Sequence, residues 1–285
     1  RTSVWARSGM ALRILQVGLN EPGRNFRKCK PPTQVLNAVG CHNCTMSEQS
    51  IPQPHRTIRS FVLRAGRMTE AQRRALELDW PAFGINIDPE KRETLDLADI
   101  FGRVTDKVVE IGFGNGDDLV EYARQDPERD FIGIEVHRAG VGHALLQAKE
   151  LGLRNLKVIC HDAVEVLEQH LADSSLSEVL ILFPDPWHKK RHQKRRLIQA
   201  PFVDLLARKL KMGGLLQLAT DWEPYALQMR EVISACPDFF NRSEEHGGSD
   251  GFVPRPAWRA LTRFEKRGQR LGHGVWDLSF RRVSR

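Results

Sequence analysis

Residues 107–125 read KVVEIGFGNGDDLVEYARQ and pass from an apolar, β-branched run through alternating glycines into a helix-forming segment. The first five residues predict a buried strand, and the last nine predict the helix that follows it. Between them, Gly112, Gly114 and Gly116 permit a tight turn, because glycine adopts backbone conformations that other residues avoid. The stretch therefore predicts the first strand–loop–helix unit of an α/β sheet.

The same alternation continues toward the C-terminus. Predicted strands cover residues 131–134, 156–160, 179–183, 215–219 and 276–280, and predicted helices cover 137–151, 164–171, 197–210 and 224–235. Strands and helices joined by short loops require right-handed crossovers and a mostly parallel sheet. The predicted fold class is therefore α/β, a doubly wound, mostly parallel, Rossmann-like sheet over residues 100–285, with residues 276–280 as a late antiparallel strand at the edge.

The chain before residue 100 divides in two. Residues 1–58 lack periodicity and read as a basic, disordered tail, of which 1–45 are interpreted as upstream read-through before a natural start at Met46. Residues 59–99 are expected to form a helical segment that packs on the domain. Its helix spans 70–78, with Thr69 as the N-cap.

Composition excludes some classes of protein. Residues 1–59 hold nine Lys and Arg against two acids and so carry the whole net charge of +7. No apolar run reaches the roughly 20 residues that cross a bilayer, so no membrane association is expected. Five scattered cysteines suit a reducing cytoplasm. Cys41 and Cys44 have zinc-like spacing, but no second pair exists, so no metal is expected. The oligomeric state stays open, with a monomer favoured.

Acidic residues follow three successive predicted strands. Glu110 ends the first strand, Glu135 the second, and Asp162 follows the third. An acid at the end of the second strand can bridge two ribose hydroxyls, and Asp162 can accept a hydrogen bond from an adenine amino group. For Asp162 alone, helix N-capping is the alternative interpretation. Because parallel strands present their carboxyl ends at one edge of a sheet, these side chains predict a ligand site there.

The spacing of the glycines discriminates between two cofactors. The dinucleotide fingerprint is G-x-G-x-x-G with a pyrophosphate at the helix N-terminus. Here the spacing is G-x-G-x-G, and Asp117 and Asp118 at that N-terminus would repel a pyrophosphate. Glu110 also suits a cation. The pattern therefore favours S-adenosylmethionine, which carries a sulfonium and an amino group, over a dinucleotide.

The fourth predicted strand leads into Phe183-Pro-Asp-Pro-Trp187. Each proline fixes its own φ and biases the preceding residue toward extended geometry, which predicts a stiff loop. The loop presents Asp185 beside Trp187, on which a flat aromatic ligand could stack. The alternative is an ordinary turn with a core tryptophan. Asp221 and Trp222 repeat the pairing of an acid with an aromatic residue after the fifth strand.

Residues 188–196 hold six Lys and Arg and no acid. A solvated helix start is the alternative interpretation, but cations at a helix N-terminus oppose its dipole. Phosphates would offset that cost. A second group of arginines precedes the domain, at Arg59, Arg64, Arg67, Arg73 and Arg74. Together the two groups predict a polyanionic substrate, with RNA favoured over DNA.

With these motifs, residues 58–285 resemble the bacterial tRNA (guanine-N7-)-methyltransferases, class I S-adenosylmethionine-dependent enzymes. The resemblance rests on RSFVLR (59–64), EIGFGNG (110–116), GIEVH (133–137), FPDPWHK (183–189), ATDW (219–222) and TRFEKRG (262–268). It implies methylation of N7 of a guanine in the tRNA variable loop, guanine-46, with Asp185 as the candidate catalytic residue. In addition to Asp185, it implies cofactor contacts from Glu110, Gly112, Gly114, Gly116, Glu135 and Asp162; substrate contacts from Lys189, Asp221, Thr262, Arg263, Phe264 and Glu265; and RNA contacts from Arg191, Lys194, Arg195 and Arg196.

Two other functions stay open from the residues alone. One is an S-adenosylmethionine-dependent methyltransferase that acts on a protein or a small molecule. The other is a non-catalytic RNA-binding protein on a methyltransferase fold, which the intact glycines and acids disfavour. A dehydrogenase is a distant third.

Overall fold

The computed structural model describes residues 59–61, 67–88, 90–248, 250–259, 265 and 274–283. All of them belong to one compact unit, His55–Arg285. The predictions made for residues 1–58, and for Thr262, Arg263 and Phe264, lie outside the described residues.

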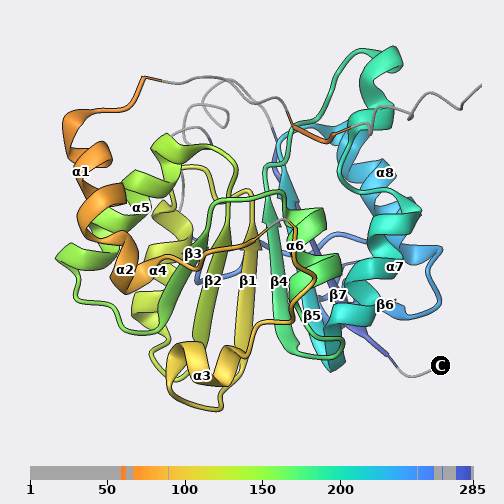
Figure 1. The fold of residues 1–285 in the computed structure, drawn as a ribbon. Helices are drawn as coiled ribbons and strands as arrows, with labels where there is room; N and C mark the ends of the chain where they lie inside the picture. The colour runs from red at the N-terminus through yellow and green to blue at the C-terminus, as the bar shows by residue number, and fades with distance from the viewer. Residues whose placement is uncertain are drawn as a thin grey trace, which may run out of the picture. The chain divides into compact units, whose positions relative to one another are not determined.

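A seven-stranded mixed sheet in the order β3-β2-β1-β4-β5-β7-β6 forms the centre of the described structure (Figure 1). Its strands are β1 (Lys107–Ile111), β2 (Asp130–Ile134), β3 (Leu156–Ile159), β4 (Leu176–Leu182), β5 (Leu210–Thr220), β6 (Phe239–Asn241) and β7 (Trp276–Arg282). The first five strands are parallel, and β7 runs antiparallel to both of its neighbours. The predicted fold class is confirmed.

The position predicted for the last strand needs correction. β7 is antiparallel as predicted, but it lies between β5 and β6 instead of at the edge. The edge strand is β6, which spans only three residues, Phe239–Asn241. A strand of that length carries too little alternation to be recognised in a sequence.

Helices cover both faces of the sheet. They are α1 (Glu70–Leu78), α2 (Trp80–Phe83), α3 (Leu97–Phe101), α4 (Asp117–Gln125), α5 (Arg138–Glu150), α6 (Ala163–His170), α7 (Ala200–Lys209) and α8 (Glu223–Ser234), with 3-10 turns η1 (Lys190–Arg195) and η2 (Glu244–His246). Neighbouring residues of β1 belong to different cores: Val109 packs with α6, α7 and α8, whereas Val108 packs with α4 and α5. Period-two burial on both faces is the property that makes the sheet doubly wound.

α1 lies against α5 on the β3 side of the sheet (Figure 1). Thr69 and Gln72 form a reciprocal capping box at the start of α1, which fixes its first residue. The approach to α5 is close at Gly142, where an added Cβ would lie 2.7 Å from the Gln72 carbonyl oxygen. A glycine is therefore needed at this crossing.

A buried ion cluster joins the starts of β1 and β2. The Asp130 carboxylate accepts hydrogen bonds from Thr105 Oγ1 at 2.6 Å and Arg103 Nε at 2.8 Å. It also pairs with Lys107 Nζ at 2.9 Å, and Asp130 and Lys107 are adjacent across the parallel register. Burial raises the pKa of Asp130, but hydrogen bonds from Thr105, Lys107 and Arg103 outweigh it and hold that pKa below its ordinary value.

We expect Asp130→Asn to lower the free energy of unfolding at pH 7 by about 3 kcal/mol, because Lys107 is left buried without its counter-ion. Since the folded-state pKa of Asp130 is depressed, its contribution is present above the unfolded value of about 3.9 and is lost as pH falls through the folded value. Urea unfolding at pH 7 and pH 3 measures both effects. The difference between wild type and variant should shrink at the lower pH.

Asp106→Asn is the matched control for Asp130→Asn. Asp106 pairs with Lys211, and both side chains are about half exposed. Removing such an exposed pair should change the free energy of unfolding by less than about 1 kcal/mol. An Asp130→Asn variant no less stable than this control would contradict the structural role of the buried cluster.

Candidate functional site

The glycine loop, residues 112–116, turns the chain from β1 into α4. Gly112, Gly114 and Gly116 have φ of 72°, 58° and 84°, so all three lie in the left-handed region that glycine tolerates best. An added Cβ at Gly116 would lie 2.7 Å from the Cβ of Ala144 on α5, whereas one at Gly112 or Gly114 would meet nothing within 4 Å. The third glycine therefore permits helix packing, and the first two leave open space beside the backbone.

Glu135, the residue after β2, is buried and tied to this loop. Its Oε2 accepts a hydrogen bond from the Gly114 amide at 2.9 Å, and its Oε1 accepts from the amides of Val136 at 2.7 Å and His137 at 2.9 Å. The carboxylate thus fixes the glycine loop to the end of β2. Oε2 accepts only one of these bonds, so it retains a lone pair for a ligand hydroxyl.

Glu110, in β1, is 3% exposed. Its Oε2 has no hydrogen-bond partner among the described residues. Burial, followed by the charges of Asp118 and Glu135, raises its pKa well above the ordinary value. A buried carboxyl group without a partner destabilises the folded protein, and an ammonium or sulfonium group would relieve that cost.

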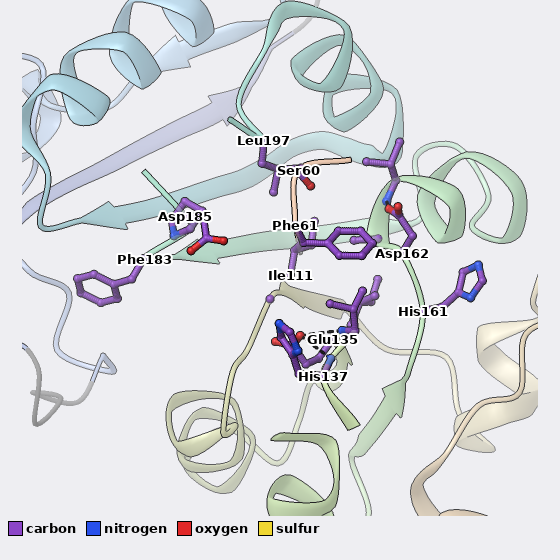
Figure 2. A pocket seen from close by; sticks show the side chains of 16 residues that line it. Ser60, Phe61, Ile111, Glu135, His137, His161, Asp162, Phe183, Asp185 and Leu197 are labelled. Carbon is purple, nitrogen blue, oxygen red and sulfur yellow. Dashed lines mark hydrogen bonds between the residues drawn. The ribbon is translucent and has the colours of Figure 1, made fainter. Parts of the chain in front are cut away.

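One cavity of about 210 Å³ collects the acids that follow the strands. Glu135, Asp162 and Asp185 line it and surround the ring of Phe61 (Figure 2). Glu110 does not line the cavity; it is buried in β1, next in sequence to the lining residue Ile111. Asp162 is also the N-cap of α6, since its Oδ1 accepts from the Val164 amide at 2.9 Å. The capping and ligand interpretations of Asp162 are therefore compatible.

The Asp185 loop, residues 183–187, follows β4. Phe183 has a φ of 51° and Trp187 one of 45°, so the prediction of an extended residue before Pro184 is wrong for Phe183. Neighbouring segments hold this strained backbone in place. The Phe183 amide donates to the Ala219 carbonyl at 2.8 Å, and Arg196 Nε donates to the Pro186 carbonyl at 2.9 Å. Contacts of this kind are required where non-glycine residues adopt positive φ.

Trp187 is engaged within the protein. Its Nε1 donates to the Ser60 carbonyl at 3.1 Å, and the Arg195 guanidinium lies 4.6 Å from the centre of its ring. Trp187 is not part of the cavity lining; Ser60 and Phe61 are. Trp187 thus anchors residues 60–61, which line the cavity. Trp187 was predicted to stack on a ligand, but Arg195 already covers one face of its ring.

Lys189 and Asp221, both predicted to contact substrate, are exposed on the loops after β4 and β5. These loops meet where the His188 and Trp222 rings pack edge to face at 4.3 Å. Glu265, predicted to act with them, is instead buried and pairs with Arg259 Nη1 at 2.8 Å. Its carboxylate therefore holds a protein cation, and direct substrate contact through that oxygen conflicts with this geometry.

The basic segment, residues 188–196, needs two corrections. α7 begins at Ala200, and Lys190–Arg195 form a separate 3-10 turn, so the predicted conflict with a helix dipole does not arise. Arg196 is 5% exposed, bonded to Pro186 and Gln228, with its guanidinium over the Tyr225 ring. Its predicted RNA contact conflicts with this burial. Arg191 and Lys194 are exposed, and Arg195 is half-buried.

Several cavity residues were not predicted to lie at the site. They include Ser60, Phe61, His137, His161 and Leu197. The motif at 59–64 was part of the family resemblance, but nothing in its local pattern indicates that Phe61 reaches a cavity formed by strands 50 or more residues away. Such a contact is a property of the tertiary structure.

The described part of the chain contains neither a candidate metal site nor a candidate membrane-spanning helix. Within the ranges that the structure describes, no group of three or more His, Cys, Asp or Glu side chains is placed to hold a metal ion. No helix in the same ranges has the length and apolar character to cross a bilayer.

Comparisons with known proteins identify the family of this chain. A family model described as "Putative methyltransferase" matches residues 105–278, which include the glycine loop, the cavity acids and the Asp185 loop. A tRNA (guanine-N(7)-)-methyltransferase from Shewanella amazonensis is 55% identical over 228 residues, covering 80% of this chain and 93% of that protein. One from Pseudomonas paraeruginosa is 52% identical over 240 residues, covering 84% and 95%.

Replacement of Glu110 should separate stability from ligand binding. Because the folded-state pKa of Glu110 is raised, its ionisation destabilises the folded protein as pH rises above the unfolded value of about 4.3. We expect Glu110→Gln to melt at a higher temperature than wild type at pH 8, yet to bind S-adenosylmethionine about tenfold more weakly. Thermal scanning and isothermal titration calorimetry measure the two effects.

The pH dependence of binding provides the control. Wild-type affinity for S-adenosylmethionine should rise with pH as Glu110 ionises, since its pKa is raised, and that dependence should be reduced in Glu110→Gln. A variant that is less stable than wild type at pH 8 and binds with unchanged affinity would refute the role given to the buried carboxyl group.

Proposed function

This chain belongs to the tRNA (guanine-N(7)-)-methyltransferase family, and we propose that it transfers a methyl group from S-adenosylmethionine to N7 of a guanine in tRNA, with guanine-46 of the variable loop as the target. The observation that carries this proposal is the convergence of Glu135, Asp162 and Asp185 on one cavity, at the sheet edge where Glu110 Oε2 is buried with no hydrogen-bond partner among the described residues. The exposed cations of the basic segment adjoin that cavity through the Asp185 loop.

The residues around the cavity fit S-adenosylmethionine. When bound, this cofactor supplies a methyl group on a positively charged sulfur. Buried Glu110 and half-buried Asp118 provide acidic groups for its cationic end, and the bare backbone at Gly112 and Gly114 permits close approach. Glu135 would accept from ribose hydroxyls through Oε2, and Asp162 would accept from the adenine amino group. Because S-adenosylmethionine has no phosphate, the site needs no cation to bind one.

The acceptor atom determines what the protein must do. Guanine N7 has an in-plane lone pair and no proton, so its attack on a methyl group requires no general base. Catalysis then depends on in-line placement and on stabilising the positive charge that develops on the guanine ring. Asp185 is exposed and lines the cavity, where its negatively charged carboxylate can stabilise that positive charge. Lys189 and Asp221 flank the entrance on the adjoining loops.

The basic segment provides a surface for RNA phosphates. Lys189, Lys190, Arg191 and Lys194 are exposed, and within the described ranges none of them forms a salt bridge with an acid. Phosphate contacts of this kind position a nucleic acid without reading its sequence. Arg195, half-buried on Trp187, would join the RNA surface to the segment over the cavity.

The proposed function is tested with unmodified tRNA, labelled S-adenosylmethionine and mapping of the methylated base. Label at N7 of a single guanine in the variable loop is the expected result. Label in protein or in a small molecule, with none in tRNA, would favour a methyltransferase with another substrate. Binding of tRNA without transfer would favour a non-catalytic RNA-binding protein.

We expect Asp185→Asn to lower kcat by about 10²-fold, because both the position and the charge of the carboxylate act in the transition state. Since no general base is required, the pH–rate profile should gain no new ionisation. The matched control is Asp99→Asn in α3, an exposed acid at the opposite ends of the strands. Near-native kcat in Asp185→Asn would contradict the proposed catalytic role.

Lys194→Gln tests the RNA surface. Loss of one phosphate contact should weaken tRNA binding and reduce the slope of log K against log salt concentration by about 1. The control is Lys91→Gln, whose side chain is 71% exposed and lies in the loop before α3. Filter binding at several salt concentrations measures both slopes. Equal slopes for the two variants would show that Lys194 does not contact phosphate.

A further inference from the structure

Arg259 is a fully buried arginine that no part of the proposed mechanism uses. The residue is 1% exposed and is among the largest fully buried side chains of the described chain. Arginine is almost never buried to this extent unless its charge is paired. Its partners come from three separate parts of the chain, and one of them is the first residue of the Asp185 loop.

Two carboxylates bind the Arg259 guanidinium. Its Nε and Nη2 donate to the two oxygens of Asp277 at 3.1 and 3.0 Å, and its Nη1 donates to Glu265 at 2.8 Å. Asp277 belongs to β7, and Glu265 belongs to the motif at 262–268. Burial raises the pKa of Asp277, with a further contribution from Glu265 that opposes the effect of Arg259. The arginine is therefore the cation that holds two acids together in the interior.

The third partner is Phe183. The Arg259 guanidinium carbon lies 5.4 Å from the centre of the Phe183 ring, within the range of a cation–π contact. Phe183 has a positive φ and stands two residues before Asp185. In Figure 2 its ring is directed away from Phe61, and Asp185 lies between the two. Contact with Arg259 therefore restrains the side chain at the bend from which Asp185 enters the cavity.

The buried cluster of Arg259, Asp277 and Glu265 is not an efficient way to stabilise the fold. Buried ion clusters are often no more stabilising than apolar side chains of similar volume. A planar guanidinium, however, can bind two carboxylates at fixed angles and present its face to a ring, which neither a lysine nor an apolar side chain can do. The geometry thus favours a positional role, in which one side chain sets the relative places of three segments.

We propose that Arg259 is a positioning residue for methyl transfer, which fixes the Asp185 loop through Phe183 and holds the Glu265 carboxylate at the same point. The inference rests on the proposed function. Arg196 restrains the other end of the loop through the Pro186 carbonyl, so the two arginines hold Asp185 from both sides in sequence. Neither arginine touches the reacting atoms.

The test uses two variants of the full chain. Arg259→Lys keeps the positive charge but loses the fork, and Phe183→Leu removes the ring but leaves the ion cluster intact. For both, we expect kcat with tRNA to fall by about tenfold to a hundredfold. In Arg259→Lys, whose side chain does not line the cavity, the Kd for S-adenosylmethionine should change by less than about threefold. Phe183 does line the cavity, so in Phe183→Leu the fall in kcat should exceed the change in that Kd. Melting temperatures should stay within about 5 °C of wild type.

Arg255→Lys is the matched control, since Arg255 lies on the same segment, is exposed and donates a hydrogen bond at 3.0 Å to the Arg259 backbone carbonyl. It should retain wild-type kcat. The proposal is overturned if Arg259→Lys and Phe183→Leu both keep wild-type kcat, or if kcat, cofactor affinity and melting temperature fall together in Phe183→Leu. Should Arg259→Lys fail to fold, Phe183→Leu decides alone.

The two proposals fail in different ways. A wild-type protein that transfers no methyl group to tRNA would remove the proposed function, and the inference with it. A wild-type protein that methylates a tRNA guanine, accompanied by variants of unchanged kcat, would remove only the role of Arg259.

Discussion

The site depends on two acidic side chains buried at the ends of β1 and β2. Glu110 lies in the interior with one oxygen lacking a partner in the described chain, and burial, followed by the charges of Asp118 and Glu135, raises its pKa. Glu135 in turn binds the glycine loop through three amides. A protein selected for stability alone would replace Glu110 with an apolar residue. The fold instead retains a site whose electrostatics are completed by a cation, and this property separates it from dinucleotide-binding sheets of the same class.

The second constraint is the rigidity of the loop after β4. Prolines limit its own conformations, but its positive φ at Phe183 and Trp187 is maintained from outside. Ala219, Arg196 and Ser60 each supply one hydrogen bond to it. Chemistry that needs no proton transfer relies on placement. A loop held at both ends by other segments is therefore suited to methylation of a ring nitrogen, and the same contacts link the cofactor side of the cavity to the exposed basic segment.

Much of the fold and of the candidate site was predictable from local sequence pattern. The bounds of β1 and α4 follow from their apolar periodicity, and the ends of the other parallel strands were predicted closely enough to place Glu135, Asp162 and Asp185 at one edge of the sheet. The failures have physical causes. β6 is too short for periodicity, and the conformation of Phe183 opposes the usual preference of a residue before proline. The burial of Arg196 and Glu265 depends on partners distant in the sequence, which no local pattern reports.

The sequence by itself determined the order of strands and helices, the glycine loop, the acids that follow three strands and the family to which these motifs point, because each is written in neighbouring residues. The tertiary structure decided which charged side chains are exposed to a substrate and which bind other parts of the protein. It left Arg191 and Lys194 exposed, turned Arg196 inward to hold a carbonyl, and set Glu265 against Arg259. The reason is that a charge's role follows from its burial and its partners, and both are fixed only when segments far apart in the chain pack together.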